Sequence, residues 1–94
     1  MDKKKDQEIL LLTLEMLKNN SLLRQNISST LLQRSLRPNY PNIRITTVRR
    51  IIAALEELKI IAYIPTEEQV SFRWTYIATD EYLDEVIEKI KEAE

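Results

Sequence analysis

The sequence predicts a small α+β domain that is mostly helical. Four stretches carry apolar residues at helical spacing, and two short stretches rich in β-branched and aromatic residues flank a polar turn near residue 65. The chain has 94 residues, of which 44% are hydrophobic, so it is long enough for one compact core. We therefore expect a single domain over residues 1–94, with a three-helix core, a β-hairpin and an extra C-terminal helix.

Periodicity and end signals place the elements. Helices are expected at about 6–19, 28–37, 46–58 and 80–93, and the hairpin at about 60–77. The segment 21–27 fits either a short strand or an irregular link. Polar residues that suit helix N-termini are present at each start. The expected caps are Asp6, Ser28 or Ser29, Thr46 or Thr47, and Thr79.

The central stretch, Ile43–Leu58, has the sequence IRITTVRRIIAALEEL. Its apolar residues fall at helical spacings that can share one face. These are Val48, Ile51, Ile52, Leu55 and Leu58. The opposite face is expected to carry Thr47, Arg49, Arg50 and Ala54. A short helix with an apolar back and a basic, hydroxyl-rich front fits a DNA major groove.

The charge is unevenly distributed. The net charge is −1, yet residues 16–55 hold seven basic residues and no acidic one. Residues 80–94 hold seven acidic residues and two lysines. This separation favours an anionic partner for the middle of the chain, namely nucleic acid. The alternative is a basic surface that serves only solubility.

The candidate DNA-binding residues are the basic and hydroxyl side chains of this region. They are Arg34, Arg37, Arg44, Thr46, Thr47, Arg49, Arg50 and Arg73. Arg49 and Arg50 suit guanine or phosphate, and the threonines suit a thymine methyl or a phosphate oxygen. The arginines outside the central helix suit backbone phosphates. The hairpin tip carries Glu67 and Glu68, which would repel phosphate.

Composition argues against several other functions. The chain has no Cys, no His and no Gly. Thiol nucleophiles, imidazole bases, most transition-metal sites and Gly-rich phosphate loops are therefore absent, and we expect no enzyme activity, cofactor or metal. Neither a secretory signal nor a membrane span is visible, so we expect a cytoplasmic protein.

Two apolar patterns leave alternatives open. Phe72, Trp74 and Tyr76 alternate along one strand, where they form either the core face of the hairpin or a stacking surface for single strands. The stripes of the first and last helices suit a two-fold homodimer or packing within one chain. The dimer-interface candidates are Leu10, Leu14, Leu83, Val86, Ile87 and Ile90.

The element order and the segment TVRRIIAALEELKIIAYI (47–64) resemble the winged helix-turn-helix DNA-binding superfamily. Lys59 departs from the resemblance, because the family usually places Gly at this helix end. A left-handed backbone there would strain Lys59 by about 1 kcal/mol. The segment VSFRWTYIATDEYLDEVIEKI (70–90) is also similar to the winged-helix domain of archaeal transcription factor E and the large subunit of its eukaryotic counterpart.

The resemblance implies a sequence-specific protein that binds double-stranded DNA. It would be a small dimeric transcriptional regulator that inserts helix 46–58 into the major groove, with two such helices about one DNA turn apart. The alternative is a protein-interaction module that docks on RNA polymerase or another transcription component. The acidic hairpin tip and the acidic last helix motivate this second hypothesis.

Overall fold

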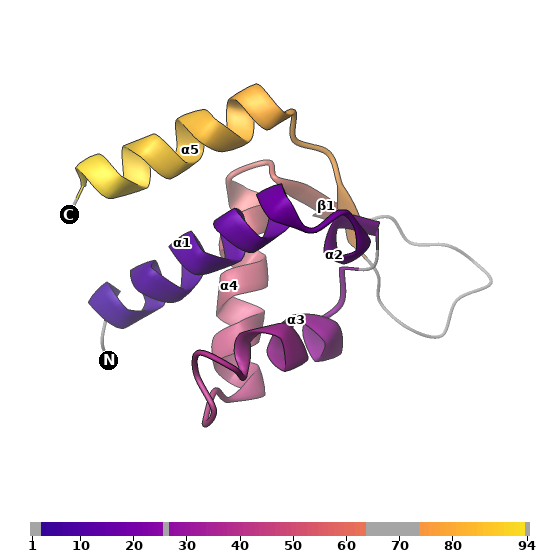
Figure 1. Cartoon of the computed structure of the whole chain (residues 1–94), viewed down its shortest axis with the longest axis vertical. Helices are drawn as coiled ribbons and strands as arrows, with labels where there is room; N and C mark the ends of the chain where they lie inside the picture. Colours follow the sequence, from indigo (N-terminus) through magenta and orange to yellow (C-terminus); the bar gives the residue numbers. More distant parts are fainter. Residues whose placement is uncertain (1–2, 26, 64–73, 94) are drawn as a thin grey trace.

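The computed structural model describes residues 3–25, 27–63 and 74–93. These residues form a mostly helical α+β fold with one two-stranded antiparallel sheet, as the sequence predicts. Figure 1 shows the arrangement. The elements are α1 (Lys3–Asn19), α2 (Ser21–Gln25), α3 (Ser29–Leu36), α4 (Ile45–Glu57), β1 (Ile61–Tyr63), β2 (Trp74–Tyr76) and α5 (Asp80–Glu92).

The first helix begins earlier than expected. Because α1 starts at Lys3, Asp6 lies inside its first turn and is not its N-cap. Residues 21–25 form the short helix α2, which corrects the expectation of a strand or an irregular link. The side chain of Asn20 supports this turn, since its Oδ1 accepts a hydrogen bond from the backbone N–H of Leu23 (3.2 Å). Among the described residues of segment 21–27, Ile27 alone pairs as a strand does, through one antiparallel bridge to Trp74.

The helix α3 starts at an N-cap that the sequence identifies. The Ser28 hydroxyl accepts a hydrogen bond from the N–H of Leu31 (3.1 Å). The start of α4 differs from expectation, because its N-cap is Arg44, which makes no side-chain capping bond. Thr46 and Thr47 already lie in the first turn, so their expected capping role is wrong.

The end of α4 explains the conformation of Lys59. The N–H of Ile60 donates to the carbonyl of Leu55 (2.9 Å), and the N–H of Lys59 donates to the carbonyl of Glu56 (3.1 Å). This pair of bonds is a Schellman motif, which requires a left-handed residue after the helix. Lys59 supplies it with φ 64°. The strain expected from the sequence is therefore located where the helix turns into β1.

We predict that Lys59→Gly stabilises the protein by about 0.5–1 kcal/mol, because glycine adopts positive φ without a Cβ clash. The Lys59 side chain is exposed, so its loss removes little packing. Urea denaturation of both proteins measures the difference. Glu57→Gly, at the last residue of α4 and two positions before Lys59, should destabilise by up to about 1 kcal/mol and serves as the control. A destabilised Lys59→Gly variant would contradict the prediction.

The two strands pair with Ile61 opposite Tyr76 and Tyr63 opposite Trp74. The sheet is anchored to α4, since Trp74 Nε1 donates to Glu56 Oε1 (2.6 Å). Trp74 and Tyr76 are half-buried and pack against the core, whereas Thr75 between them is exposed. For these two aromatics the core-face interpretation is confirmed. Phe72, Arg73 and the acidic hairpin tip lie outside the described residues.

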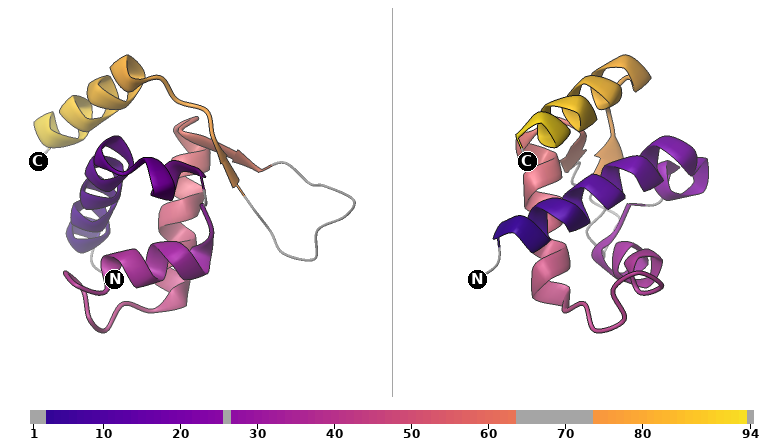
Figure 2. Two further views of the ribbon diagram at one scale, coloured as in Figure 1. Left: turned by 45° about the vertical axis from the view of Figure 1, so that its right-hand side comes forward. Right: turned by 60° about the vertical axis from the view of Figure 1, so that its left-hand side comes forward.

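One hydrophobic core joins all the helices. The side chains that are almost completely buried come from every helix and from β1. They include Leu14, Leu17, Leu32, Leu36, Leu55, Ile61 and Leu83. In Figure 2, α1 crosses α4, and α5 runs alongside α1. None of the described helices is long and apolar enough to cross a membrane.

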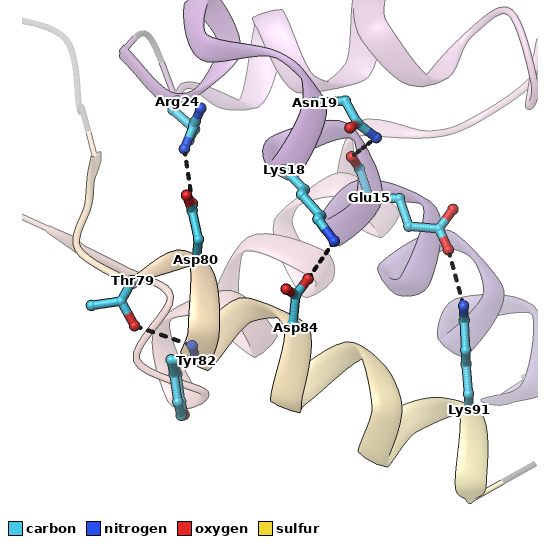
Figure 3. A network of polar contacts seen from close by, with 9 residues as sticks. All are labelled: Glu15, Lys18, Asn19, Arg24, Thr79, Asp80, Tyr82, Asp84 and Lys91. Carbon is cyan, nitrogen blue, oxygen red and sulfur yellow. Dashed lines mark hydrogen bonds and ion pairs between the residues drawn. The ribbon is translucent and has the colours of Figure 1, made fainter.

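Polar contacts fix α5 to the N-terminal half of the chain (Figure 3). Lys18 pairs with Asp84 (2.5 Å), and Arg24 pairs with Asp80 (3.4 Å). The carboxylate of Asp84 raises the pKa of Lys18. The helix begins as the sequence predicts, because the Thr79 hydroxyl accepts from the N–H of Tyr82 (3.1 Å). These contacts place the start of α5 beside the end of α1.

The stripes expected at a dimer interface are covered within one chain. Leu14 and Leu83 are 0% exposed, and Val86 and Ile87 are 5% and 6% exposed. Leu10 and Ile90 are half-buried against the same core. The α1–α5 contact therefore removes the unpaired stripe that motivated the homodimer. The dimer stays a prediction, and it now needs another surface or an exchange of α5 between chains.

Candidate nucleic-acid interface

The segment 16–55 contains no acidic residue, but the fold brings acidic residues of α1 and α5 against some of its cations. Lys18 and Arg24 pair with the acidic start of α5. Arg50 pairs with Asp6 of α1, with Nε to Oδ2 at 3.1 Å and Nη2 to Oδ1 at 3.4 Å. The expectation that no acid lies near these cations is therefore wrong for three of the seven.

The other four cations share one region. We call them the corner arginines: Arg34, Arg37, Arg44 and Arg49. All four are exposed, and none forms an ion pair within residues 3–25, 27–63 and 74–93. They lie on the C-terminal half of α3, at its C-cap, at the N-cap of α4 and on the first half of α4. The fold thus concentrates unpaired positive charge where α3 turns into α4.

Hydrogen bonds order the loop between α3 and α4. The N–H groups of Asn39 and Tyr40 both donate to the carbonyl of Leu36 (3.1 and 2.8 Å). The side chain of Gln33 donates to the carbonyl of Ile43 (3.2 Å). Because these bonds tie both ends of the loop to α3, Arg37 and Arg44 extend from a fixed backbone. A pre-organised backbone limits the entropy lost when such side chains bind a partner.

Two of the four residues predicted for the exposed face of α4 are not on it. Thr46, Arg49, Arg50, Ala53 and Glu57 are exposed, whereas Thr47 and Ala54 are half-buried. A helical wheel centred on the four buried residues of α4 places Thr46 and Glu57 almost directly opposite them, with Ala53 and Arg50 about 30° to either side, so the signal was present in the sequence. Ala53 is a contact candidate that sequence reasoning missed. Its small side chain lets the helix approach a groove closely.

Charge along this face changes from one end of α4 to the other. Arg44 and Arg49 lie at its N-terminal half, and Glu57 is exposed at its last residue. An anionic surface would therefore approach the N-terminal half, which also has the positive end of the helix dipole. Arg50 lies on the flank that faces α1, where Nη2 also donates to Thr47 Oγ1 (3.4 Å). A partner that binds the Arg50 guanidinium must therefore displace the carboxylate of Asp6.

The aromatic residues of the sheet lie apart from this charge. The Arg24 guanidinium lies 5.5 Å from the ring centroid of Tyr76, and the Tyr63 and Trp74 rings are 6.1 Å apart. The Tyr76 hydroxyl is buried without a hydrogen-bond partner among the described residues. Burial raises the pKa of Tyr76 above 10.0, and the positive charge of Arg24 offsets part of this effect.

This pKa shift predicts a loss of stability at alkaline pH. Below the ordinary tyrosine pKa both states are protonated and the effect is absent. Above about pH 10 the unfolded chain releases the Tyr76 proton first, so the free energy of unfolding falls as the pH rises toward the folded pKa. Urea denaturation between about pH 9 and about pH 11 should show a steeper fall for the native protein than for Tyr76→Phe. Equal slopes would contradict the prediction.

The described residues contain no group of three or more acidic side chains that could hold a metal ion. No match links the chain to a known protein: no family model, no curated protein and no solved structure is similar enough to assign it to a family.

Proposed function

We propose that this chain is a winged helix-turn-helix protein that binds double-stranded DNA. The order of α1, α3, α4, β1 and β2 supports this assignment, as does the bridge from Ile27 to Trp74, which adds a third extended segment beside the hairpin. The short helix α2 and the C-terminal helix α5 are additions to that plan. In this proposal α3 and α4 form the helix-turn-helix, and α4 is the recognition helix.

The observation that carries the proposal is the separation of paired from unpaired cations. The cations that face α1 and α5 are paired with carboxylates, whereas the corner arginines are not. The outer face of α5 is acidic and exposed, with Glu81, Glu85 and Glu88 among its residues. Such a charge distribution orients the protein during its encounter with a polyanion, so that the corner arginines face the polyanion.

The corner arginines divide into two roles in this proposal. Arg49 extends from the exposed face of α4 and would reach base edges, where Arg reads guanine O6 and N7. Arg34, Arg37 and Arg44 lie around the entry to α4 and would contact phosphates, which fix the register of the helix in the groove. Sequence-specific binding of this kind suits a transcriptional regulator.

A fluorescence anisotropy titration with duplex DNA tests the proposal. If Arg34, Arg37 and Arg44 neutralise about three phosphates, the affinity should fall about 40-fold between about 50 and about 200 mM salt. A matched titration with a neutral polymer of similar length controls for non-specific adsorption. Absence of binding at the lowest salt concentration, or an affinity that does not change with salt, would contradict the proposal.

A further inference from the structure

A cavity of about 520 Å³ lies beside the candidate interface, between the first turns of α1, the loop after α3 and the start of α4. Its wall combines charge with apolar surface. The residues that define its chemistry are Lys5, Asp6, Ile9, Tyr40, Arg44 and Arg50. Ligand pockets for small molecules commonly enclose roughly 300–1,000 Å³. The cavity is therefore large enough for a compact organic molecule.

The charged part of the wall favours an anion. Three cations, Lys5, Arg44 and Arg50, face one acid, Asp6. Arg50 already holds the Asp6 carboxylate through Nε and Nη2. This two-nitrogen contact is the geometry by which Arg recognises carboxylates. The positive end of the α4 dipole adds to the attraction, because the N-cap Arg44 makes no side-chain capping bond.

The apolar part of the wall favours a ligand with a hydrophobic body. Tyr40 and Ile43 are half-buried against the core, so each leaves apolar surface open to the cavity, whereas Ile9 is 2% exposed and offers almost none. Pro41 completes this side of the cavity. An inorganic anion would leave this surface in contact with water. A ring-sized apolar group would cover it.

We propose that the cavity binds a small organic carboxylate with a ring-sized apolar body. Its carboxylate takes the place of Asp6 on Arg50 and lies near Arg44, while its body covers Tyr40 and Pro41. Asp6 acts as an internal competitor for the ligand. The cavity shares Arg44 and Arg50 with the candidate interface, so an occupant would compete with DNA phosphate; this consequence alone depends on the proposed function.

Isothermal titration of the full chain with phenylacetate tests the site without DNA. Phenylacetamide, which has the same shape and no charge, is the matched ligand control and should bind at least about tenfold more weakly. Arg50→Ala should weaken phenylacetate binding at least about tenfold, whereas Asp6→Asn should tighten it several-fold, because the competitor is neutralised. Arg49→Ala, the adjacent arginine outside the cavity wall, should leave binding unchanged.

The two variants are expected to change phenylacetate affinity in opposite directions, and this difference distinguishes a binding site from a purely structural ion pair. If the Asp6–Arg50 pair were only structural, both variants would weaken binding, and this result would overturn the proposal. Equal binding of phenylacetate and phenylacetamide, or no binding of either, would also overturn it. Far-ultraviolet circular dichroism of each variant verifies that the helices are intact. Failure of DNA binding would leave all these outcomes unaffected.

Discussion

Replacing Arg44 and Arg49 together by glutamine should weaken binding to duplex DNA by about 100-fold at moderate salt. Each lost contact to a base or phosphate typically costs about 1–3 kcal/mol, and each lost phosphate contact lowers the salt dependence by about one ion. Both side chains are exposed and form no ion pair within the described residues, so their loss should leave the fold intact. Anisotropy titrations at several salt concentrations measure both quantities.

The matched control is Lys18→Gln with Arg24→Gln, which removes the same net charge from the other side of the domain. These two cations pair with Asp84 and Asp80 of α5. Their loss should change DNA affinity by no more than about threefold, through long-range attraction alone. An equal loss for both double variants would mean that only net charge matters, and would contradict a localised interface.

Leu83→Ala should lower the free energy of unfolding by about 2–5 kcal/mol, the usual cost of removing a fully buried leucine side chain. Leu83 is 0% exposed and belongs to α5, which packs against α1. A loss of this size is a large part of the total stability of a small domain, which is about 5–15 kcal/mol. Urea denaturation at several protein concentrations measures the effect.

Glu88→Ala provides the control in the same helix, because Glu88 is exposed and forms no ion pair within the described residues. It should change the free energy of unfolding by less than about 0.5 kcal/mol. Because α5 packs on its own chain, the difference between the native and Leu83→Ala midpoints should not depend on protein concentration. A difference that changes with concentration would indicate that α5 packs between chains.

Local sequence signals account for most of the fold. The four long helices have apolar stripes, the N-caps of α3 and α5 are recognisable, and the Schellman motif at Lys59 forms at a helix end where glycine is usual. Residues 21–27 were ambiguous for a physical reason. A five-residue helix has almost no periodicity, and the extended conformation of Ile27 depends on Trp74, which lies 47 positions along the chain.

The candidate site was predictable as a region but not in its details. All the corner arginines lie in the acid-free segment 16–55, where charge counting placed most of the candidate DNA-binding residues. Composition could not reveal that Arg50 is paired, because its partner Asp6 lies 44 positions away. The pairing of Arg24 with Asp80, over 56 positions, depends on the same long-range packing of helices. The cavity beside Arg44 was equally hidden, since two segments far apart in the sequence, residues 5–9 and 39–50, form its wall.

The most direct test of the account is a nuclear magnetic resonance titration of the isotopically labelled chain with duplex DNA. The account predicts that amide shifts concentrate on the C-terminal half of α3, the loop that follows it and the N-terminal half of α4, with α5 unaffected. Shifts centred on the acidic face of α5, or no shifts at low salt, would contradict DNA binding through α4. Shifts on α5 caused instead by a transcription protein would favour a docking function.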